Sequence, residues 1–353
     1  MMLTEQELSK LRTEGCLLVK GVVPRDNCER LLRACRREVF GVIAPAVKKD
    51  LLEDGKMFRG YMAVKKPDGT FGPGGPISKK GDEHLSWKDL ANNSMLQDVF
   101  AAGNSAPCWE VRELVAPVFE EIYGTSDLRT SVDNMLYEPP KQKLVSADPS
   151  KGTARWHVDH MGAEKEGVDH RHYQGLLSLS DTDWRTELAP GTLGVDSKGK
   201  RFYQLKAGEI KKITGAWAPT MEAGDLLLWD SRKPHRALPG TTERCVVPVS
   251  MSPGSWSTPQ EDEKRWEKHV LNGVTGGHRS WGHLMTFTRL PFKGTATQEM
   301  VKRRAATMDL TTRMRQLLGK EKNFDKRAQP LKPVLKRKLN NNDDVSCKIS
   351  KIN

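Results

Sequence analysis

The stretch from about residue 130 to residue 251 constrains the fold more than any other part of the chain. It consists of short apolar runs separated by turn residues, namely TSVDNMLYE, RWHVDH, YQGLLSLSD, GTLGVD, RFYQL, GDLLLWD and RCVVPVSM. Runs of this length with turns between them are typical of an antiparallel sandwich or barrel. The sequence therefore predicts a β-rich core.

Helical patterns lie on both sides of this core. Thr4 and Glu7 form a capping-box pattern at the start of a helix that Gly15 ends. Pro24 begins a second helix, and apolar residues recur at helical spacing over residues 105–122. Two further helices are expected at about 259–271 and 296–318.

The region from Asp54 to Asp82 has a different composition. Its segment KPDGTFGPGGPISKKGD is so rich in Gly and Pro that we expect a loop throughout. Long Gly-rich loops often close over active sites, so this one is a candidate lid. The side chains of this loop that could contact a substrate are Phe58, Arg59, Tyr61 and Lys65. The alternative is an unconstrained insertion.

The positive charge of the chain is concentrated near its C-terminus. The 353 residues carry a formal net charge of +12. Residues 301–353 hold 15 Lys and Arg against five acidic residues, so the rest of the chain is nearly neutral. Residues 320–353 also lack apolar periodicity, which predicts a basic, disordered tail. Such a tail could tether nucleic acid, although a solvated terminus is favoured.

The cysteines and the N-terminus indicate an intracellular protein. The six cysteines show no CxxC spacing, and Cys16 and Cys28 fall within apolar core patterns. The first fifteen residues lack the apolar segment of a secretory signal, and no run of about 18 apolar residues occurs. We therefore expect a reduced protein of the cytoplasm or nucleus, with no membrane contact.

Two motifs far apart in the chain predict a metal site. In WHVDH, His157 and Asp159 are two residues apart, so on a strand both project from the same face. His235 lies in GDLLLWDSRKPHRAL, after a second apolar run. Two histidines and one carboxylate on one face of a metal leave positions open for a co-substrate and O₂, as in non-haem Fe(II) oxygenases.

Arg244 begins the run RCVVPVS, nine residues after His235. At the inner end of a strand, a guanidinium offers two parallel donors for a carboxylate of a bound dicarboxylate. The alternative is a surface charge at the start of a strand.

Together these motifs resemble the phytanoyl-CoA dioxygenase group of Fe(II)/2-oxoglutarate oxygenases. The resemblance covers about residues 3–252, from TEQELSKLRTEGCLLVKGVVPRDNCERLLRACRREV through WHVDH, LLSLSDT and APGTLGVD to GDLLLWDSRKPHRAL and the following Arg. It implies a double-stranded β-helix, that is, a cupin-like jelly roll, flanked by helices. Residues 1–319 would form the oxygenase domain, with N-terminal helices at about 1–125, the core at about 126–256 and C-terminal helices at about 257–319.

The resemblance also implies an activity. His157, Asp159 and His235 would bind Fe(II), and Arg244 would bind the far carboxylate of 2-oxoglutarate. The enzyme would consume O₂, hydroxylate a C–H bond of a small organic or acyl substrate and release succinate and CO₂, with ascorbate as reductant. Family members commonly place this Arg ten or eleven residues after the histidine, so Arg236, next to His235, is the other candidate. The halogenating relatives replace the carboxylate ligand by a small residue, whereas Asp159 is present here.

Three alternatives remain open at this stage. The same chemistry could act on nucleic acid or protein. A non-catalytic binding protein is a second possibility, and a zinc cluster of His157 with His160, His170 and His172 is a third. Against zinc, the segment EKEGVDHRH is charged, and we expect His170 and His172 to be solvated or at the mouth of the site. The oligomeric state is left open.

Overall fold

The fold is described from a computed structural model. It covers residues 3–43, 45–46, 63–65, 71–73, 102–138, 140, 155–159, 171–191, 203–273, 275–281 and 296–321. The helical elements are α1 (Glu5–Glu14), α2 (Arg25–Arg37), η1 (Glu38–Ile43), η4 (Ala102–Asn104), α6 (Ala106–Tyr123), α7 (Ala207–Ile210), η6 (Gly254–Trp256), α8 (Pro259–Trp266), η7 (Glu267–Leu271), α9 (Ala296–Thr307) and α10 (Thr312–Leu317). The strands are β1 (Cys16–Val19), β2 (Ala63–Lys65), β3 (Phe71–Pro73), β4 (Leu128–Thr130), β5 (Leu136–Glu138), β6 (His157–Val158), β7 (Tyr173–Ser178), β8 (Arg185–Leu188), β9 (Tyr203–Gln204), β10 (Leu226–Asp230), β11 (His235–Leu238) and β12 (Arg244–Pro253).

Two antiparallel sheets form the β-rich core. The larger sheet has the order β1-β10-β7-β12-β4, and β5 also pairs with β12. The smaller sheet has the order β8-β11-β6-β9. From β5 to β12 the chain passes repeatedly from one sheet to the other, which is the winding expected of a jelly roll. The predicted β-rich α+β class is confirmed. A closed barrel is not formed by the described residues.

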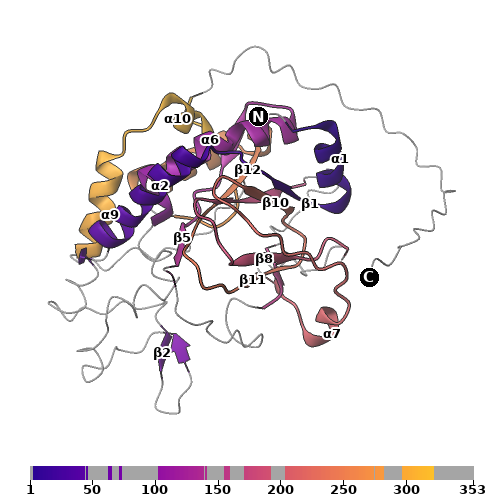
Figure 1. The fold of residues 1–353 in the computed structure, drawn as a ribbon. Helices are drawn as coiled ribbons and strands as arrows, with labels where there is room; N and C mark the ends of the chain where they lie inside the picture. The colour runs from indigo at the N-terminus through magenta and orange to yellow at the C-terminus, as the bar shows by residue number, and fades with distance from the viewer. Residues whose placement is uncertain are drawn as a thin grey trace.

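Helices cover one face of the larger sheet. Figure 1 shows α2, α6, α9 and α10 grouped on one side of β12, with β8 and β11 on the other side. The main apolar core lies between the helices and the sheet, where Leu31 and Phe119 pack with Val247 and Val249. This core fixes the position of the sheet, so its opposite face is available for a site.

The strand β12 shows how the sequence separates the two faces. Cys245, Val247 and Val249 belong to the core against the helices. The alternate residues therefore project toward the smaller sheet, and among them Val246 packs in a second cluster with Trp229. The residues that line the space between the sheets are thus set by the alternation of side chains along each strand.

The N-terminal predictions are confirmed. The Thr4 hydroxyl accepts from the backbone N–H of Glu7 at 3.2 Å, and the Glu7 carboxylate accepts from the N–H of Thr4 at 2.8 Å. Gly15 ends α1 with a φ of 72°, a left-handed conformation that glycine adopts at little cost. Pro24 precedes α2.

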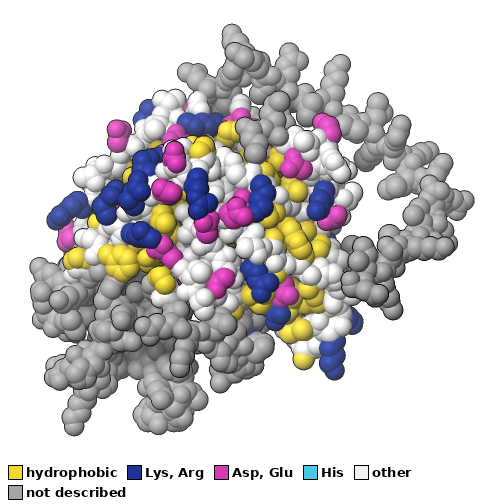
Figure 2. Space-filling model, viewed as in Figure 1, with side chains coloured by type: hydrophobic (Ala, Val, Ile, Leu, Met, Phe, Trp, Pro, Cys, Tyr) yellow, Lys and Arg dark blue, Asp and Glu magenta, His cyan; other side chains and the backbone are white. Residues whose placement is uncertain are grey.

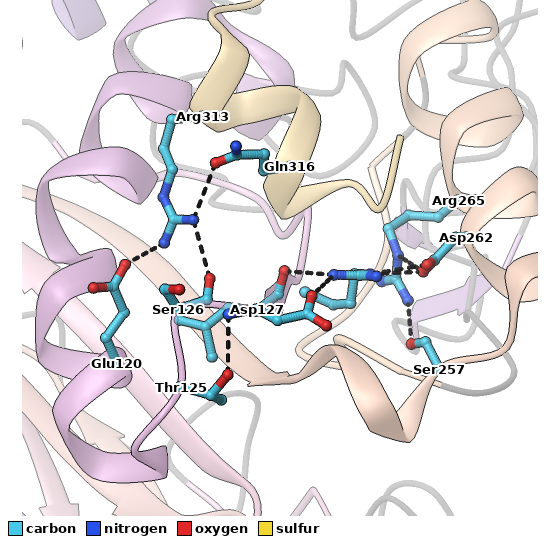
Figure 3. A network of polar contacts seen from close by, with 11 residues as sticks. Glu120, Thr125, Ser126, Asp127, Ser257, Asp262, Arg265, Arg313 and Gln316 are labelled. Atoms are coloured by element: carbon cyan, nitrogen blue, oxygen red, sulfur yellow. Dashed lines mark hydrogen bonds and ion pairs between the residues drawn. The ribbon is translucent and has the colours of Figure 1, made fainter. Parts of the chain in front are cut away.

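A buried charge network ties the C-terminal helices to the sheet (Figure 3). The Nε of Arg129 on β4 donates to both oxygens of Asp262 on α8 at 2.9 Å, and Arg265 also lies beside this carboxylate. Burial raises the pKa of Asp262, while the two guanidinium groups act in the opposite direction. On α10, Arg313 pairs with Glu120 of α6. The contacts of Arg129 with Asp262 and of Arg313 with Glu120 join elements that are distant in sequence.

Three local predictions need correction or division. Within the region expected to be loop, β2 and β3 form an antiparallel pair, and the proposed lid residue Lys65 is the last residue of β2. The rest of 54–82, with the other lid residues Phe58, Arg59 and Tyr61, lies outside the described residues. The run TSVDNMLYE is divided between β4 and β5. The helix expected at 296–318 is two helices, because Thr311 caps α10 through a bond from the N–H of Met314 at 3.1 Å. The tail after residue 321 also lies outside the described residues.

The visible surface carries mixed charge. Figure 2 shows Lys and Arg interspersed with Asp and Glu over the helical face. Several of these groups pair, such as Arg25 with Asp181 and Arg30 with Glu110. None of the helices in the described part of the chain combines the length and hydropathy that crossing a bilayer requires. The five cysteines in that part are buried, and Cys16 and Cys28 lie in the apolar core, as predicted.

Candidate metal centre

His157 and His235 face each other across the smaller sheet. They are direct partners in the antiparallel pairing of β6 with β11, and cross-strand partners project from the same face. Their ring centroids are 4.2 Å apart. The pairing therefore brings together two histidines that are far apart in the chain, as the sequence predicted.

Backbone carbonyls fix the orientation of both rings. The Nδ1 of His157 lies 2.9 Å from the carbonyl oxygen of Arg155, and the Nδ1 of His235 lies 3.0 Å from that of Lys233. A carbonyl only accepts, so in a neutral ring Nδ1 carries the proton and Nε2 carries the lone pair. This is the tautomer in which each imidazole can bind a metal through Nε2, with its other nitrogen held by a backbone group.

Asp159 completes the group. It follows His157 by two residues, and its Oδ2 lies 3.3 Å from Nε2 of His235 and 4.0 Å from Nε2 of His157. Within the described residues, these three side chains form a group whose candidate ligand atoms all lie within 4.8 Å of one another. His235 and Asp159 are buried, while the side chain of His157 is 20% exposed. One edge of the group is thus accessible.

The protonation states suit a metal ligand set. Burial, together with the neighbouring His235, lowers the pKa of His157 to about 4, so the ring is neutral near pH 7. For Asp159, burial opposes ionisation, but the surrounding imidazoles of His235, His278 and His157 bring its pKa below the ordinary value. The site therefore offers a neutral imidazole from His157 and a carboxylate from Asp159, beside the ring of His235.

A row of polar side chains borders the group on the larger sheet. Trp229, Gln174 and Ser250 are neighbours across β10, β7 and β12. Gln174 donates through Nε2 to Oδ2 of Asp159 at 3.3 Å. Trp229 Nε1, Gln174 Oε1 and Ser250 Oγ are buried without a hydrogen-bond partner among the described residues. Buried groups of this kind usually bind water or a polar ligand, so the space between the sheets suits a polar molecule.

His278 is a member of the site that sequence reasoning missed. Its Nε2 lies 3.5 Å from Oδ2 of Asp159, and its Nδ1 pairs with Oδ2 of Asp133. The surrounding TGGHRSW has neither strand alternation nor ligand spacing. Only the charged neighbours of this histidine could have indicated its role, and they come from other parts of the chain.

The two candidate arginines lie in different environments. Arg236 follows His235 on β11, so it projects from the opposite face; its Nε donates to Glu187 at 2.5 Å and it stacks on Trp156. Arg244 is buried on the β12 face that looks toward the smaller sheet, beside Trp184. Burial lowers the pKa of Arg244 to about 10, which leaves it charged at neutral pH.

The expectation that His172 is solvated is wrong. Its side chain is 2% exposed, its Nε2 lies 3.3 Å from Ser280 Oγ, and its ring lies 4.8 Å from that of Trp281. Burial lowers the pKa of His172 to about 3. His172 is absent from the group of candidate ligands. The other two members of the proposed zinc cluster, His160 and His170, lie outside the described residues.

Comparisons with known proteins give only distant likenesses. No family model and no curated protein sequence matches the chain. A non-haem α-ketoglutarate-dependent carbocyclase, SnoK from nogalamycin biosynthesis, is 13% identical with a TM-score of 0.40, over 71% of this chain and 84% of that one. EctD from S. alaskensis with bound Fe is 13% identical with a TM-score of 0.37, over 72% and 78%. A prolyl-4-hydroxylase from Pseudomonas putida is 14% identical with a TM-score of 0.31, over 70% and 97%. Because these scores are low, the chemistry of the site must be judged from its own geometry.

Proposed function

We propose that this chain is an Fe(II)/2-oxoglutarate-dependent dioxygenase that hydroxylates a C–H bond of a small organic or acyl substrate. One observation carries the proposal: Nε2 of His157, Nε2 of His235 and the carboxylate of Asp159 converge within 4.8 Å. Two imidazoles and one carboxylate are the ligand set of non-haem Fe(II) oxygenases. The iron would activate O₂ and promote decarboxylation of 2-oxoglutarate to succinate and CO₂.

The donor atoms fit such an ion. Both imidazoles present Nε2 while Nδ1 is held by a carbonyl, so binding requires no rotation of either ring. A structural zinc site would need four ligands and usually includes cysteine, and the group contains three ligands and none of them is cysteine. Three protein ligands leave positions for the keto acid of 2-oxoglutarate and for O₂.

Arg244 is the residue that we assign to the distal carboxylate of 2-oxoglutarate. It is buried and charged, and it projects into the space between the sheets. The assignment to Arg236 is less favourable, because that guanidinium is bonded to Glu187 and lies on the other face of β11. The row of Gln174, Ser250 and Trp229 supplies polar groups that the same co-substrate or its waters could satisfy.

The remaining chain would shield the reaction from bulk water. Trp229 packs beside His235 with ring centroids 5.2 Å apart. Leu188 and Met221 belong to the same buried cluster as Trp229. Apolar walls around a metal site exclude water and strengthen the electrostatic interactions inside it. The passage of the chain between the two sheets is consistent with the double-stranded β-helix of the phytanoyl-CoA dioxygenase group, to which we assign the chain as part of this proposal.

Succinate formation tests the function. Chelator-treated protein is supplied anaerobically with Fe(II), 2-oxoglutarate and ascorbate, and succinate is measured after air is admitted. Slow, uncoupled formation of succinate is expected even without a substrate. The variants His157→Ala and Asp159→Ala should abolish it, while Arg236→Gln, on the opposite face, should not. A protein that binds zinc, does not bind 2-oxoglutarate and makes no succinate would contradict the proposal.

A further inference from the structure

His278 bridges two carboxylates at the edge of the candidate metal centre. Its Nδ1 pairs with Asp133 and its Nε2 lies 3.5 Å from Oδ2 of Asp159. Each carboxylate therefore has one ring nitrogen of His278 within ion-pair distance. The histidine lies outside the group of three ligands within 4.8 Å of one another. It therefore contacts a proposed ligand without joining the ligand set.

Asp133 is held firmly enough to orient His278. Its backbone oxygen accepts from Nη2 of the fully buried Arg112 at 2.9 Å. Its other carboxylate oxygen, Oδ1, accepts from the N–H of Asn134 at 2.7 Å. Gly103 packs directly against this backbone, since a Cβ at Gly103 would lie 1.8 Å from the Asp133 oxygen. Few other positions of this carboxylate are compatible with these contacts.

The segment that carries His278 is anchored on both sides of the histidine. Before it, the N–H of Gly276 donates to the carbonyl of Val132 at 2.7 Å, next to Asp133. After it, Ser280 Oγ donates to Ser252 Oγ at 2.8 Å. Both anchors connect the segment to the core, so the position of the imidazole is set by the fold. This arrangement resembles the outer contacts that orient ligands in metalloproteins.

We propose that Asp133 and His278 form a positioning pair that holds Asp159 in its metal-binding orientation, an inference that rests on the proposed function. Gln174 donates to the same oxygen of Asp159 at 3.3 Å. The two contacts come from different parts of the chain, so rotation of the carboxylate would break both. The pair thus acts before the metal arrives, by lowering the cost of ordering Asp159.

Co(II) binding tests the pair independently of turnover. Co(II) is titrated into chelator-treated full-length protein, and affinity is measured by calorimetry and visible absorption. His278→Ala should weaken binding by about 10- to 100-fold, the usual effect of removing such an outer contact. His278→Gln should recover part of this loss, because its amide N–H can donate to Asp159. His269→Gln, a buried histidine on η7, serves as the matched control and should leave the affinity unchanged.

A double-mutant cycle shows whether Asp133 acts through His278. Asp133→Asn alone should weaken Co(II) binding. In the His278→Ala protein the same change should alter the affinity by less than about twofold, because the side chain that connects Asp133 to Asp159 is already absent. Equal effects of Asp133→Asn in both proteins would overturn the pairing. Unfolding temperatures of the metal-free variants identify any loss of fold.

The outcomes also separate this inference from the proposed function. If the wild-type protein does not bind Co(II), or if His157→Ala binds it equally well, the proposed metal centre is wrong. The positioning pair alone is wrong if the wild type binds Co(II) and His157→Ala does not, while folded His278→Ala binds Co(II) as tightly as the wild type. A Co(II) absorption spectrum that is changed in His278→Ala and restored in His278→Gln would support the assignment.

Discussion

Replacement of Arg244 by Gln should weaken the binding of 2-oxoglutarate while leaving metal binding intact. Gln keeps an amide donor but is shorter than Arg, has no charge and cannot form the two parallel, charge-assisted bonds to a carboxylate. Arg244 is buried and adjoins Trp184, so little water is available to compensate for the missing guanidinium. The metal ligands lie on other strands.

The size of the effect follows from the interactions that are lost. A hydrogen bond to a charged group contributes about 1.5–3 kcal/mol, and each 1.4 kcal/mol corresponds to about tenfold in affinity. We therefore expect the dissociation constant of 2-oxoglutarate to rise by about 10- to 150-fold. The same change at Arg236, which is bonded to Glu187 on the other face of β11, should alter it by less than about twofold.

Glu138 must be considered in this experiment. It is buried directly across the β5–β12 pairing from Arg244, and its charge favours the charged form of the arginine. Removing the guanidinium therefore lowers stability as well, because a buried carboxylate loses its compensating charge. The double variant Arg244→Gln/Glu138→Gln should recover stability without recovering 2-oxoglutarate binding.

The assay is calorimetric titration of 2-oxoglutarate into protein loaded with Mn(II) under anaerobic conditions. Urea unfolding of each variant reports its stability separately. Unchanged affinity in a folded Arg244→Gln protein would refute the assignment. A large loss in Arg236→Gln, with none in Arg244→Gln, would transfer the role to Arg236.

Two further predictions concern stability. His172 has a pKa of about 3 in the folded chain, against an ordinary value of 6.5 in the unfolded chain. Between these two pH values only the unfolded chain binds the proton. The contribution of His172 to the free energy of unfolding is therefore complete above pH 6.5 and falls as the pH is lowered, by about 2 kcal/mol at pH 5. Urea unfolding of the metal-free protein at pH 5 and 7.5 should show this loss of unfolding free energy, and in His172→Phe the loss should be smaller by about 2 kcal/mol. Equal pH dependence of stability in the two proteins would contradict the prediction. Asp262→Ala leaves Arg265 buried without its carboxylate, and Arg129 keeps only its pair with Asp127. The change should therefore cost about 3–5 kcal/mol of unfolding free energy, with succinate formation per folded molecule unchanged. A cost below about 1 kcal/mol would show that this network contributes little.

Local sequence patterns predicted the elements that depend on local interactions. The capping box of α1, the start of α2 after Pro24, and helix α6 were all predicted, because cap bonds and apolar periodicity depend on residues a few positions apart. The convergence of His157 with His235 was predicted as well. It did not come from local pattern alone: the meeting of the two histidines was expected from the sandwich-like order of the strands, and it depends on the pairing of β6 with β11.

Long-range contacts explain what the sequence did not reveal. The burial of His172 depends on Trp281 and Ser280, which come from a distant segment, so the charged residues around it in EKEGVDHRH were misleading. Likewise, the role of His278 depends on Asp133 and Asp159, and neither lies near it in the chain. Polar pairs of this kind leave no periodic signal, because each member is fixed by the fold and not by its neighbours.

The central claim is that His157, Asp159 and His235 bind one metal ion. Crystals soaked with Mn(II) and 2-oxoglutarate test it most directly, because anomalous scattering identifies the manganese position without reference to activity. One anomalous peak in contact with Nε2 of both histidines and with the carboxylate of Asp159 is predicted. A fully ordered site with no peak there, or a peak bound by other residues, would contradict the account.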